Sequence, residues 1–221
     1  MCSSDLTYQI APGSLAEVEK RFGEAYENRR KISPLAAFWH TEIGPLNQII
    51  HVWPYQDLAE RARIRDAAVK ESGGKWPPKT AEFLVSQRSD IFMPFAFSPE
   101  IKPGKQGPFF EMRTYTYASG QLGNLTRAWE AAIPNRLKHG PVTAILYSEL
   151  GGLNKFVHIW PYRTLDERWA MRNRMRETGE WPPSVVARKK GLPDYHLVQQ
   201  ENKILRSEEH TSELQSPIHI S

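Results

Sequence analysis

The sequence predicts an α+β fold in which two ferredoxin-like β-α-β-β-α-β modules pack as an intramolecular, pseudo-dimeric α+β barrel. The main observation is an internal repeat: the chain reads LNQIIHVWPYQDLAER from Leu46 and LNKFVHIWPYRTLDER from Leu153, an offset of 107 residues. A repeat at a fixed offset marks a repeated structural unit. We therefore predict a first module over residues 7–98, a second over 109–206, and a Pro- and Gly-rich linker over 99–108.

The first strand and the first helix of each module follow from side-chain periodicity. In the second module, Phe109–Tyr117 alternates and is rich in aromatic residues and threonine, which is typical of a strand. Apolar residues then recur at helical spacing after Gly120, and Gly140 with Pro141 ends this helix. The apolar stripe consists of Leu122, Leu125, Trp129, Ala132 and Ile133.

A β-hairpin and a capped helix complete the module. Two strand-like segments on either side of Gly151 and Gly152 indicate the hairpin. Thr164, followed three residues later by Glu167, indicates a capping box at the start of the second helix. The resulting order is the ferredoxin-like one. The two hairpin strands, the second helix, a short helix and the last strand are predicted over Val142–Leu150, Leu153–Trp160, Thr164–Thr178, 181–190 and Asp194–Leu205.

The sheet of each module has two faces that both need cover. Helices are expected on one face, and the other face is too apolar to be exposed to solvent. We therefore expect the helix-free faces of the two modules to pack together. Because strand residues alternate between faces, Glu111 and Arg113 share one face of the first strand, and His158 lies on one face of the third. We predict that these residues point away from the helices, into the space between the sheets.

Both ends of the chain look foreign. Residues 1–6 and 207–221 resemble translated sequencing-adapter sequence, and the tail has no counterpart after the first module. We predict that both ends are non-native. The first strand of the first module would then be cut short, and the lone Cys2 would not belong to the natural protein.

Composition excludes several classes of function. The chain has 221 residues and a formal net charge of +4, with Lys and Arg dispersed among acidic residues, so we expect no nucleic-acid partner. It has no apolar run that could cross a bilayer and no leader, so we expect no transmembrane segment and a cytoplasmic location. Phosphate loops, zinc spacings and nucleophile elbows are also missing from the sequence.

The stretch FEMRTYTYASGQL from Phe110 and the stretch ELGGLNKFVHIWPYRTLDER from Glu149 resemble NIPSNAP domains. The first module shows a related EIGPLNQIIHVWPYQDLAER from Glu42. This resemblance implies a dimeric α+β barrel, usually assembled from two modules. The wider superfamily includes cofactor-free monooxygenases, haem enzymes and muconolactone isomerases, but a shared fold does not fix a function.

His51 and His158 occupy equal positions in the two copies. On the predicted inward face an imidazole could act as an acid, a base or a ligand. The alternative is a core histidine that a neighbouring carboxylate or hydroxyl satisfies. One histidine per module, without Cys, Asp or a second His at ligand spacing, does not indicate a metal site. We therefore predict no metal and no cofactor.

An inward-facing Arg113 would need a partner, because an unpaired buried charge is costly. Glu111 on the same face gives a structural ion pair, and the alternative is that Arg113 anchors an anion or a carboxylate. Since the first strand of this fold pairs with the third, Arg113 can approach His158. We take His158, His51 and Arg113 as candidate catalytic residues. We interpret Arg168 and Arg172 as a solvated helix face, with a structural pairing of Arg172 as the alternative because it lies near the apolar stripe.

Aromatic residues from both modules are predicted to line the same inter-sheet cavity, although core packing is the alternative. Together with Glu111, these candidate ligand-binding residues are Tyr115, Phe156, Trp160 and Tyr162 of the second module and Tyr8, Trp53 and Tyr55 of the first.

Two functions follow from this arrangement. The first is a binding or interaction barrel for a small hydrophobic or anionic ligand, with a further homo-oligomer left open. The second is a cofactor-light, oxygenase- or isomerase-like enzyme that uses His158 or His51 with Arg113 and Tyr115. A void of about 300 Å³ or more in which His and Arg converge would favour the enzyme. A sheet interface filled by side chains would favour the binding barrel.

Overall fold

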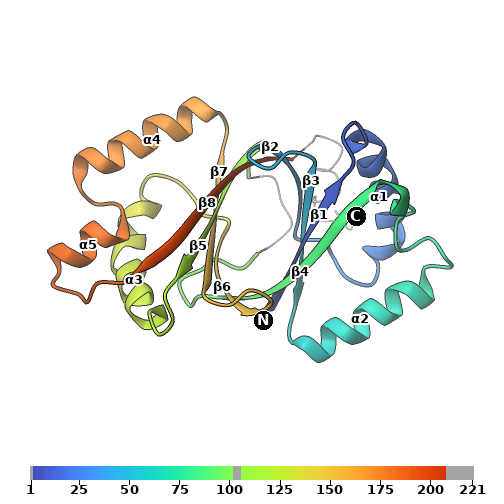
Figure 1. The fold of residues 1–221 in the computed structure, drawn as a ribbon, viewed down its shortest axis with the longest axis horizontal. Coiled ribbons are helices and arrows are strands. Elements are labelled where there is room, and N and C mark those ends of the chain that lie inside the picture. The colour runs from blue at the N-terminus through green and yellow to red at the C-terminus, as the bar shows by residue number, and fades with distance from the viewer. Residues whose placement is uncertain (1, 102–105, 208–221) are drawn as a thin grey trace, which may run out of the picture.

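The structure, a computed structural model, describes residues 2–101 and 106–207, which form a closed barrel of eight strands (Figure 1). The first module contributes β1 (Cys2–Ile10), α1 (Leu15–Arg29), β2 (Ala37–Ile43), β3 (Gln48–Tyr55), α2 (Leu58–Glu71), the short 3₁₀ helix η1 (Ala81–Phe83) and β4 (Leu84–Pro94). The second contributes β5 (Phe109–Tyr117), α3 (Leu122–Leu137), β6 (Ala144–Leu150), β7 (Lys155–Tyr162), α4 (Leu165–Thr178), α5 (Pro183–Lys189) and β8 (Leu197–Arg206).

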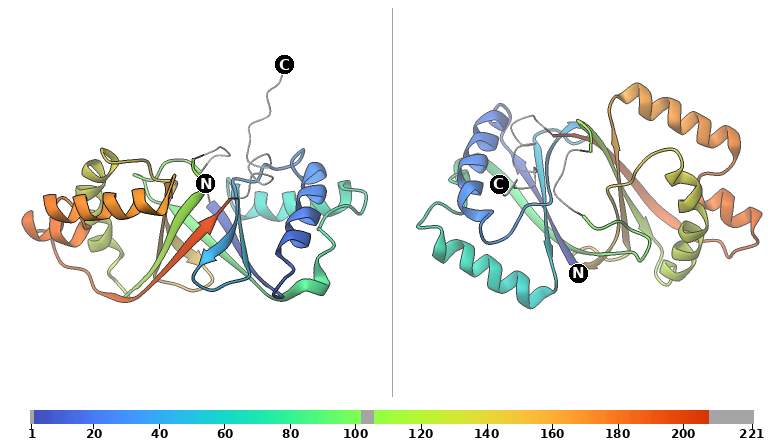
Figure 2. Two further views of the ribbon diagram at one scale, coloured as in Figure 1. Left: turned by 90° about the horizontal axis from the view of Figure 1, so that it is seen from above. Right: turned by 180° about the vertical axis from the view of Figure 1, so that it is seen from behind.

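Each module keeps the strand order of a ferredoxin-like sheet, β4-β1-β3-β2 in the first and β8-β5-β7-β6 in the second. The two antiparallel sheets join edge to edge, with β2 beside β8 and β4 beside β6, which closes the barrel. Helices α1 and α2 lie outside the barrel on one side, and α3, α4 and α5 lie on the opposite side (Figure 2). The predicted fold class is confirmed.

The capping boxes predicted from the sequence start the second helix of each module. The Thr164 hydroxyl accepts a hydrogen bond from the Glu167 amide at 3.0 Å, and Asp57 accepts one from the Glu60 amide at 2.7 Å. These caps satisfy amides that have no partner within the helix. None of the helices in residues 2–101 and 106–207 has the length and apolar character that a bilayer span requires.

Apolar side chains from both modules fill part of the barrel interior. Trp39 on β2 and Phe110 on β5 are buried and lie with their ring centroids 5.0 Å apart. This contact joins the two modules directly, and removal of such surface from water is the main favourable contribution to folding. The other buried residues of this inner cluster are Ala37, Ile50, Val52, Phe92, Met112, Ala144, Leu146, Val157, Ile159 and Leu205.

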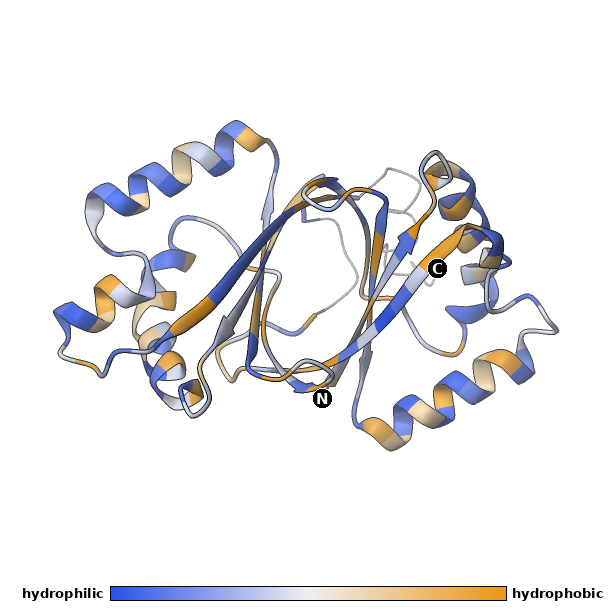
Figure 3. Cartoon of the chain, viewed as in Figure 1, coloured by the Kyte–Doolittle hydropathy of each residue, from blue (hydrophilic) through white to orange (hydrophobic). Residues whose placement is uncertain are grey.

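The rest of the interior is polar. The middle stretches of β4 and β8 are hydrophilic (Figure 3) and largely exposed. They line a cavity of about 390 Å³ together with residues such as Thr114 and Lys155, and its lining among the described residues includes no histidine. The space between the sheets therefore lacks the histidines that we expected there.

The predicted direction of the functional face is wrong. Glu111, Arg113 and His158 share one face, as expected, but this face points outward to the helices, where His158 lies 4.8 Å from Trp129 of α3 between ring centroids. The inner face instead carries the alternate residues, such as Met112 and Val157. Both faces of each sheet are apolar and covered, so alternation alone does not tell which one faces inward.

The ends of the chain bear on the prediction of non-native residues. Strand β1 has nine residues, as β5 has, but it includes residues 2–6, so the truncation of the native strand stays a prediction. The non-native origin of residues 1–6 stays a prediction. The predicted tail 207–221 lies outside the described residues except for Ser207, whose amide donates to the Pro108 carbonyl at 3.1 Å.

We predict that Trp39→Ala lowers the free energy of unfolding by about 3–5 kcal/mol, because it opens a cavity where the two modules meet. Trp169→Ala, a matched change of a tryptophan that is 61% exposed on α4, should change it by less than about 0.5 kcal/mol. Urea unfolding followed by circular dichroism measures both. Similar small losses for the two variants would show that the barrel interior contributes little to stability.

Candidate functional site

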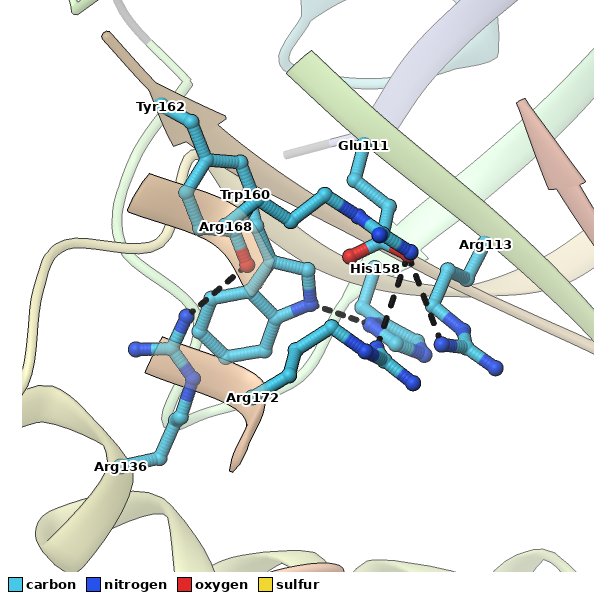
Figure 4. Close-up of polar contacts among 8 residues, drawn as sticks. All are labelled: Glu111, Arg113, Arg136, His158, Trp160, Tyr162, Arg168 and Arg172. Atoms are coloured by element: carbon cyan, nitrogen blue, oxygen red, sulfur yellow. Dashed lines mark hydrogen bonds and ion pairs between the residues drawn. The ribbon is translucent and has the colours of Figure 1, made fainter. Parts of the chain in front are cut away.

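A cavity of about 230 Å³ lies in the second module between the outer face of the sheet and the helices α3, α4 and α5. Its aromatic wall consists of Tyr115 and Trp160 from the sheet, Trp129 from α3 and Trp181, which precedes α5. Figure 4 shows the charged and polar side chains of this region, which come from β5, β7, α3 and α4.

Glu111 on β5 is the centre of a charged cluster. Its carboxylate is buried, and its Oε1 atom accepts hydrogen bonds from Arg168 and, at 3.5 Å, from Arg113. The guanidinium of Arg172 lies 3.6 Å from the same oxygen (Figure 4). The predicted pair between Glu111 and Arg113 is confirmed, and so is the alternative of a structural pairing for Arg172. The interpretation of Arg168 as part of a solvated face is wrong.

The Oε2 atom of Glu111 has a different environment. It is buried and has no hydrogen-bond partner among the described residues. Three guanidinium groups thus crowd one carboxylate oxygen of Glu111, a residue of the cavity lining, and the other oxygen remains an acceptor without a partner.

His158 on β7 is a neutral histidine whose tautomer is fixed by its neighbour. The Trp160 indole nitrogen donates a hydrogen bond to His158 Nδ1 (Figure 4). Since an indole N–H can only donate, Nδ1 is an acceptor and the proton of the neutral ring is on Nε2. Burial, and then the positive charges of Arg113, Arg172 and Arg136, hold the pKa of His158 well below its usual value. The Nε2–H group is buried without a hydrogen-bond partner among the described residues.

Arg136 on α3 is a functional candidate that the sequence analysis missed. Its guanidinium carbon lies 4.1 Å from the Trp160 ring centroid, and it donates to the Tyr162 hydroxyl at 3.4 Å. Burial lowers the pKa of Arg136, but an arginine side chain keeps its charge at neutral pH. The signal was available in the repeat, because Arg29 stands 107 residues earlier at the same helical position.

The cavity carries an excess of positive charge. Its described lining contains four arginines, Arg113, Arg136, Arg172 and Arg176, and a single carboxylate, Glu111. His158 does not add a charge because it is neutral. Guanidinium groups bind carboxylate and phosphate oxygens through paired hydrogen bonds, so this lining is suited to an anion.

The first module has an equivalent cavity of about 290 Å³ on the other side of the barrel. Trp53 donates to His51 Nδ1 at 2.7 Å, and Arg29 donates to the Tyr55 hydroxyl at 3.4 Å. Burial, followed by the charge of Arg65, lowers the pKa of His51 to about 3. The same tautomer argument therefore applies to His51.

The two cavities differ in charge. Leu6 and Val69 line the first-module cavity at the positions where the second module has Arg113 and Arg176. Among the described residues, the lining of the first-module cavity contains Arg29 and Arg65 and no carboxylate. It is thus the more apolar of the two.

The candidate residues from the sequence are therefore divided between two places. Glu111, Arg113, Tyr115, His158, Trp160 and Tyr162 line the second-module cavity, and Tyr8, His51, Trp53 and Tyr55 line the first-module cavity. Phe156 is fully buried against Trp129, with 4.5 Å between ring centroids, and belongs to the core. The prediction that these residues line one shared cavity between the sheets is wrong, because they lie on the outer faces. The interior contains the apolar cluster around Trp39 and Phe110 and a separate polar cavity.

Comparison with known proteins identifies the family. The NIPSNAP family profile matches residues 6–99 and 110–209. The chain belongs to the NIPSNAP family. It is 28% identical over 184 residues to the protein NipSnap homolog of Dictyostelium discoideum, covering 81% of this chain and 78% of that protein. It is 26% identical over 209 residues to human protein NipSnap homolog 3A, covering 90% of this chain and 80% of that protein.

Two similar solved structures differ in how much of the chain they cover. An uncharacterized NIPSNAP domain protein from Burkholderia xenovorans is 26% identical and covers 45% of this NIPSNAP chain and 100% of its own, with a TM-score of 0.43. A putative monooxygenase from Lactobacillus acidophilus covers 92% of both chains, with a TM-score of 0.61 and 11% identity. At that identity the likeness shows the shared fold alone.

The buried neutral histidines predict a loss of stability in acid. Below about pH 6.5 the unfolded chain binds protons at His51 and His158 that the folded chain does not bind, so the free energy of unfolding decreases as the pH falls. Each histidine contributes up to about 1.4 kcal/mol per pH unit well below pH 6.5. Urea unfolding at pH 7 and pH 5 measures the decrease, which should be smaller in His51→Gln and in His158→Gln than in the unchanged protein. An equal decrease in all three proteins would contradict the neutral assignment.

Proposed function

We propose that the second-module cavity binds a small organic anion with an aromatic or apolar body. The observation that carries this proposal is the excess of guanidinium groups over carboxylates in a cavity with aromatic walls. The anionic group would lie against Arg172 and Arg136, and the apolar body would pack on Trp129, Trp160 and Trp181. The volume of about 230 Å³ is below the ~300 Å³ at which pockets for drug-sized molecules begin, so the ligand is small.

Burial of Arg136 supports an anionic ligand independently. Among the described residues Arg136 forms no ion pair with a carboxylate, and its contacts are the Tyr162 hydroxyl, the Gly140 carbonyl and the Trp160 ring. A buried cation is costly unless it is paired or stabilised by hydrogen bonds. A ligand carboxylate would supply the paired charge.

The enzymatic alternative has less support. A histidine that acts as a base needs a free ring nitrogen. His158 Nδ1 accepts a hydrogen bond from the Trp160 indole N–H, and Nε2 carries the ring proton. His51 has the same arrangement with Trp53. The void in which His158 and the arginines converge is also smaller than the size that would favour the enzyme. The cytoplasmic location, the further homo-oligomer and the lack of a nucleic-acid partner stay predictions.

We predict that benzoate raises the melting temperature of the protein and that benzamide, which has the same ring without the charge, does not. Arg172→Met should weaken benzoate binding about tenfold or more, since a hydrogen bond to a charged group contributes about 1.5–3 kcal/mol. Isothermal titration calorimetry at pH 7 gives the dissociation constants.

Arg65→Met is the matched control, because Arg65 has the position of Arg172 in the first module. It should leave this binding unchanged, and Arg172→Lys should weaken it less than Arg172→Met. The proposal fails if benzoate and benzamide stabilise the protein equally, or if a correctly folded Arg172→Met binds benzoate as the unchanged protein does.

A further inference from the structure

Three buried polar atoms without a partner belong to residues that line the second-module cavity, and those of Glu111 and His158 are of opposite kind. The third, Arg113 Nε, is a donor like that of His158. Glu111 Oε2 is a hydrogen-bond acceptor, and His158 Nε2–H is a donor whose proton is placed by the bond from Trp160. The two residues are 1% and 2% exposed, and neither atom has a hydrogen-bond partner among the described residues. Buried polar atoms without partners are uncommon and cost free energy, so each one calls for an explanation.

The two atoms belong to neighbouring strands. Glu111 stands opposite Trp160, and Arg113 stands opposite His158, in the register between β5 and β7. Glu111 and His158 are therefore diagonal neighbours on the same face of the sheet, a spacing of about 7–8 Å that long side chains can span. Both residues belong to the wall of the cavity.

The chemistry of the two atoms limits that group. A hydroxyl can donate to Glu111 and accept from His158. A ketone or a second carboxylate can only accept, and an ammonium group can only donate. The guanidinium groups of Arg113, Arg168 and Arg172 around Glu111 would also repel a cation.

We infer that the anion bound in this cavity is a hydroxy acid: its carboxylate lies against Arg172 and Arg136, and its hydroxyl bonds to Glu111 and His158. The inference rests on the proposed anion site and adds the second functional group of the ligand. It applies to the second module alone, because β1 has Leu6 where β5 has Arg113, and the sequence has Ser4 at the position of Glu111.

Four probes with one ring and one carbon skeleton test this inference on the full chain: mandelate, phenylacetate, phenylglycine and benzoylformate. They carry a hydroxyl, a hydrogen, an ammonium and a ketone next to the carboxylate. We expect mandelate to bind about tenfold or more tightly than each of the other three in calorimetry at pH 7, because a hydrogen-bonding site discriminates against a ligand that leaves its polar atoms unpaired.

Variants connect this preference to the two atoms. In Glu111→Gln the ratio of phenylacetate to mandelate dissociation constants should fall toward one, while phenylacetate binds at least as tightly as before, since a negative charge has been removed. His158→Gln should also lower the ratio of phenylacetate to mandelate dissociation constants. It provides the test if Glu111→Gln does not fold. His51→Gln, the matched change in the first module, should leave the ratio unchanged.

The outcomes separate the two proposals. If phenylacetate or phenylglycine binds as tightly as mandelate, the hydroxy-acid inference is overturned while the anion site stands. If the ratio stays the same in both folded variants, Glu111 and His158 do not select the hydroxyl and the inference is likewise overturned. If none of these carboxylates binds and benzoate does not bind either, the proposed function fails and the inference fails with it.

Discussion

The mutual burial of the two inner sheet faces is the constraint on which the rest of the molecule depends. Trp39 and Phe110, from different modules, pack against each other among aliphatic residues of both sheets. Neither sheet could leave this surface in water, so the modules close into one barrel through the seams β2–β8 and β4–β6. Closure assigns the aliphatic face to the interior, and the face with the aromatic and ionisable residues must then lie under the helices.

The helices complete the site because they bring cations to that outer face. Arg136 comes from α3, and Arg168 and Arg172 come from α4, while Glu111 and His158 come from the sheet. The site thus exists only when sheet and helices are packed. Burial among rings and the nearby guanidinium groups oppose protonation of its histidine, so the charge of the described cavity lining comes from arginine and glutamate. Under the proposed function, such a site would recognise the charge and the hydrogen-bonding pattern of a ligand, with the neutral imidazole as a donor.

Duplication has produced two cavities with one framework and different linings. The pairs Trp53–His51 and Trp160–His158 have the same hydrogen bond, and Arg29 and Arg136 contact equivalent tyrosines. The framework holds the ring positions in both modules, whereas the charges at its edge differ. A chain with two modules can change one lining and keep the other, because the two cavities have no lining residue in common among the described residues. The helices that cover them lie on opposite sides of the barrel (Figure 2).

The sequence by itself determined the repeat, the order of the elements, the capping boxes at Asp57 and Thr164, and the sets of residues that share a face. These features are local, periodic or repeated along the chain, so the linear sequence contains the whole signal. Only the tertiary structure decided which face is inside, because both faces are apolar and alternation is symmetric between them. It also decided that Arg168 and Arg172 meet Glu111 and that Arg136 lies over Trp160, since long side chains on separate helices reach the sheet only after the helices dock.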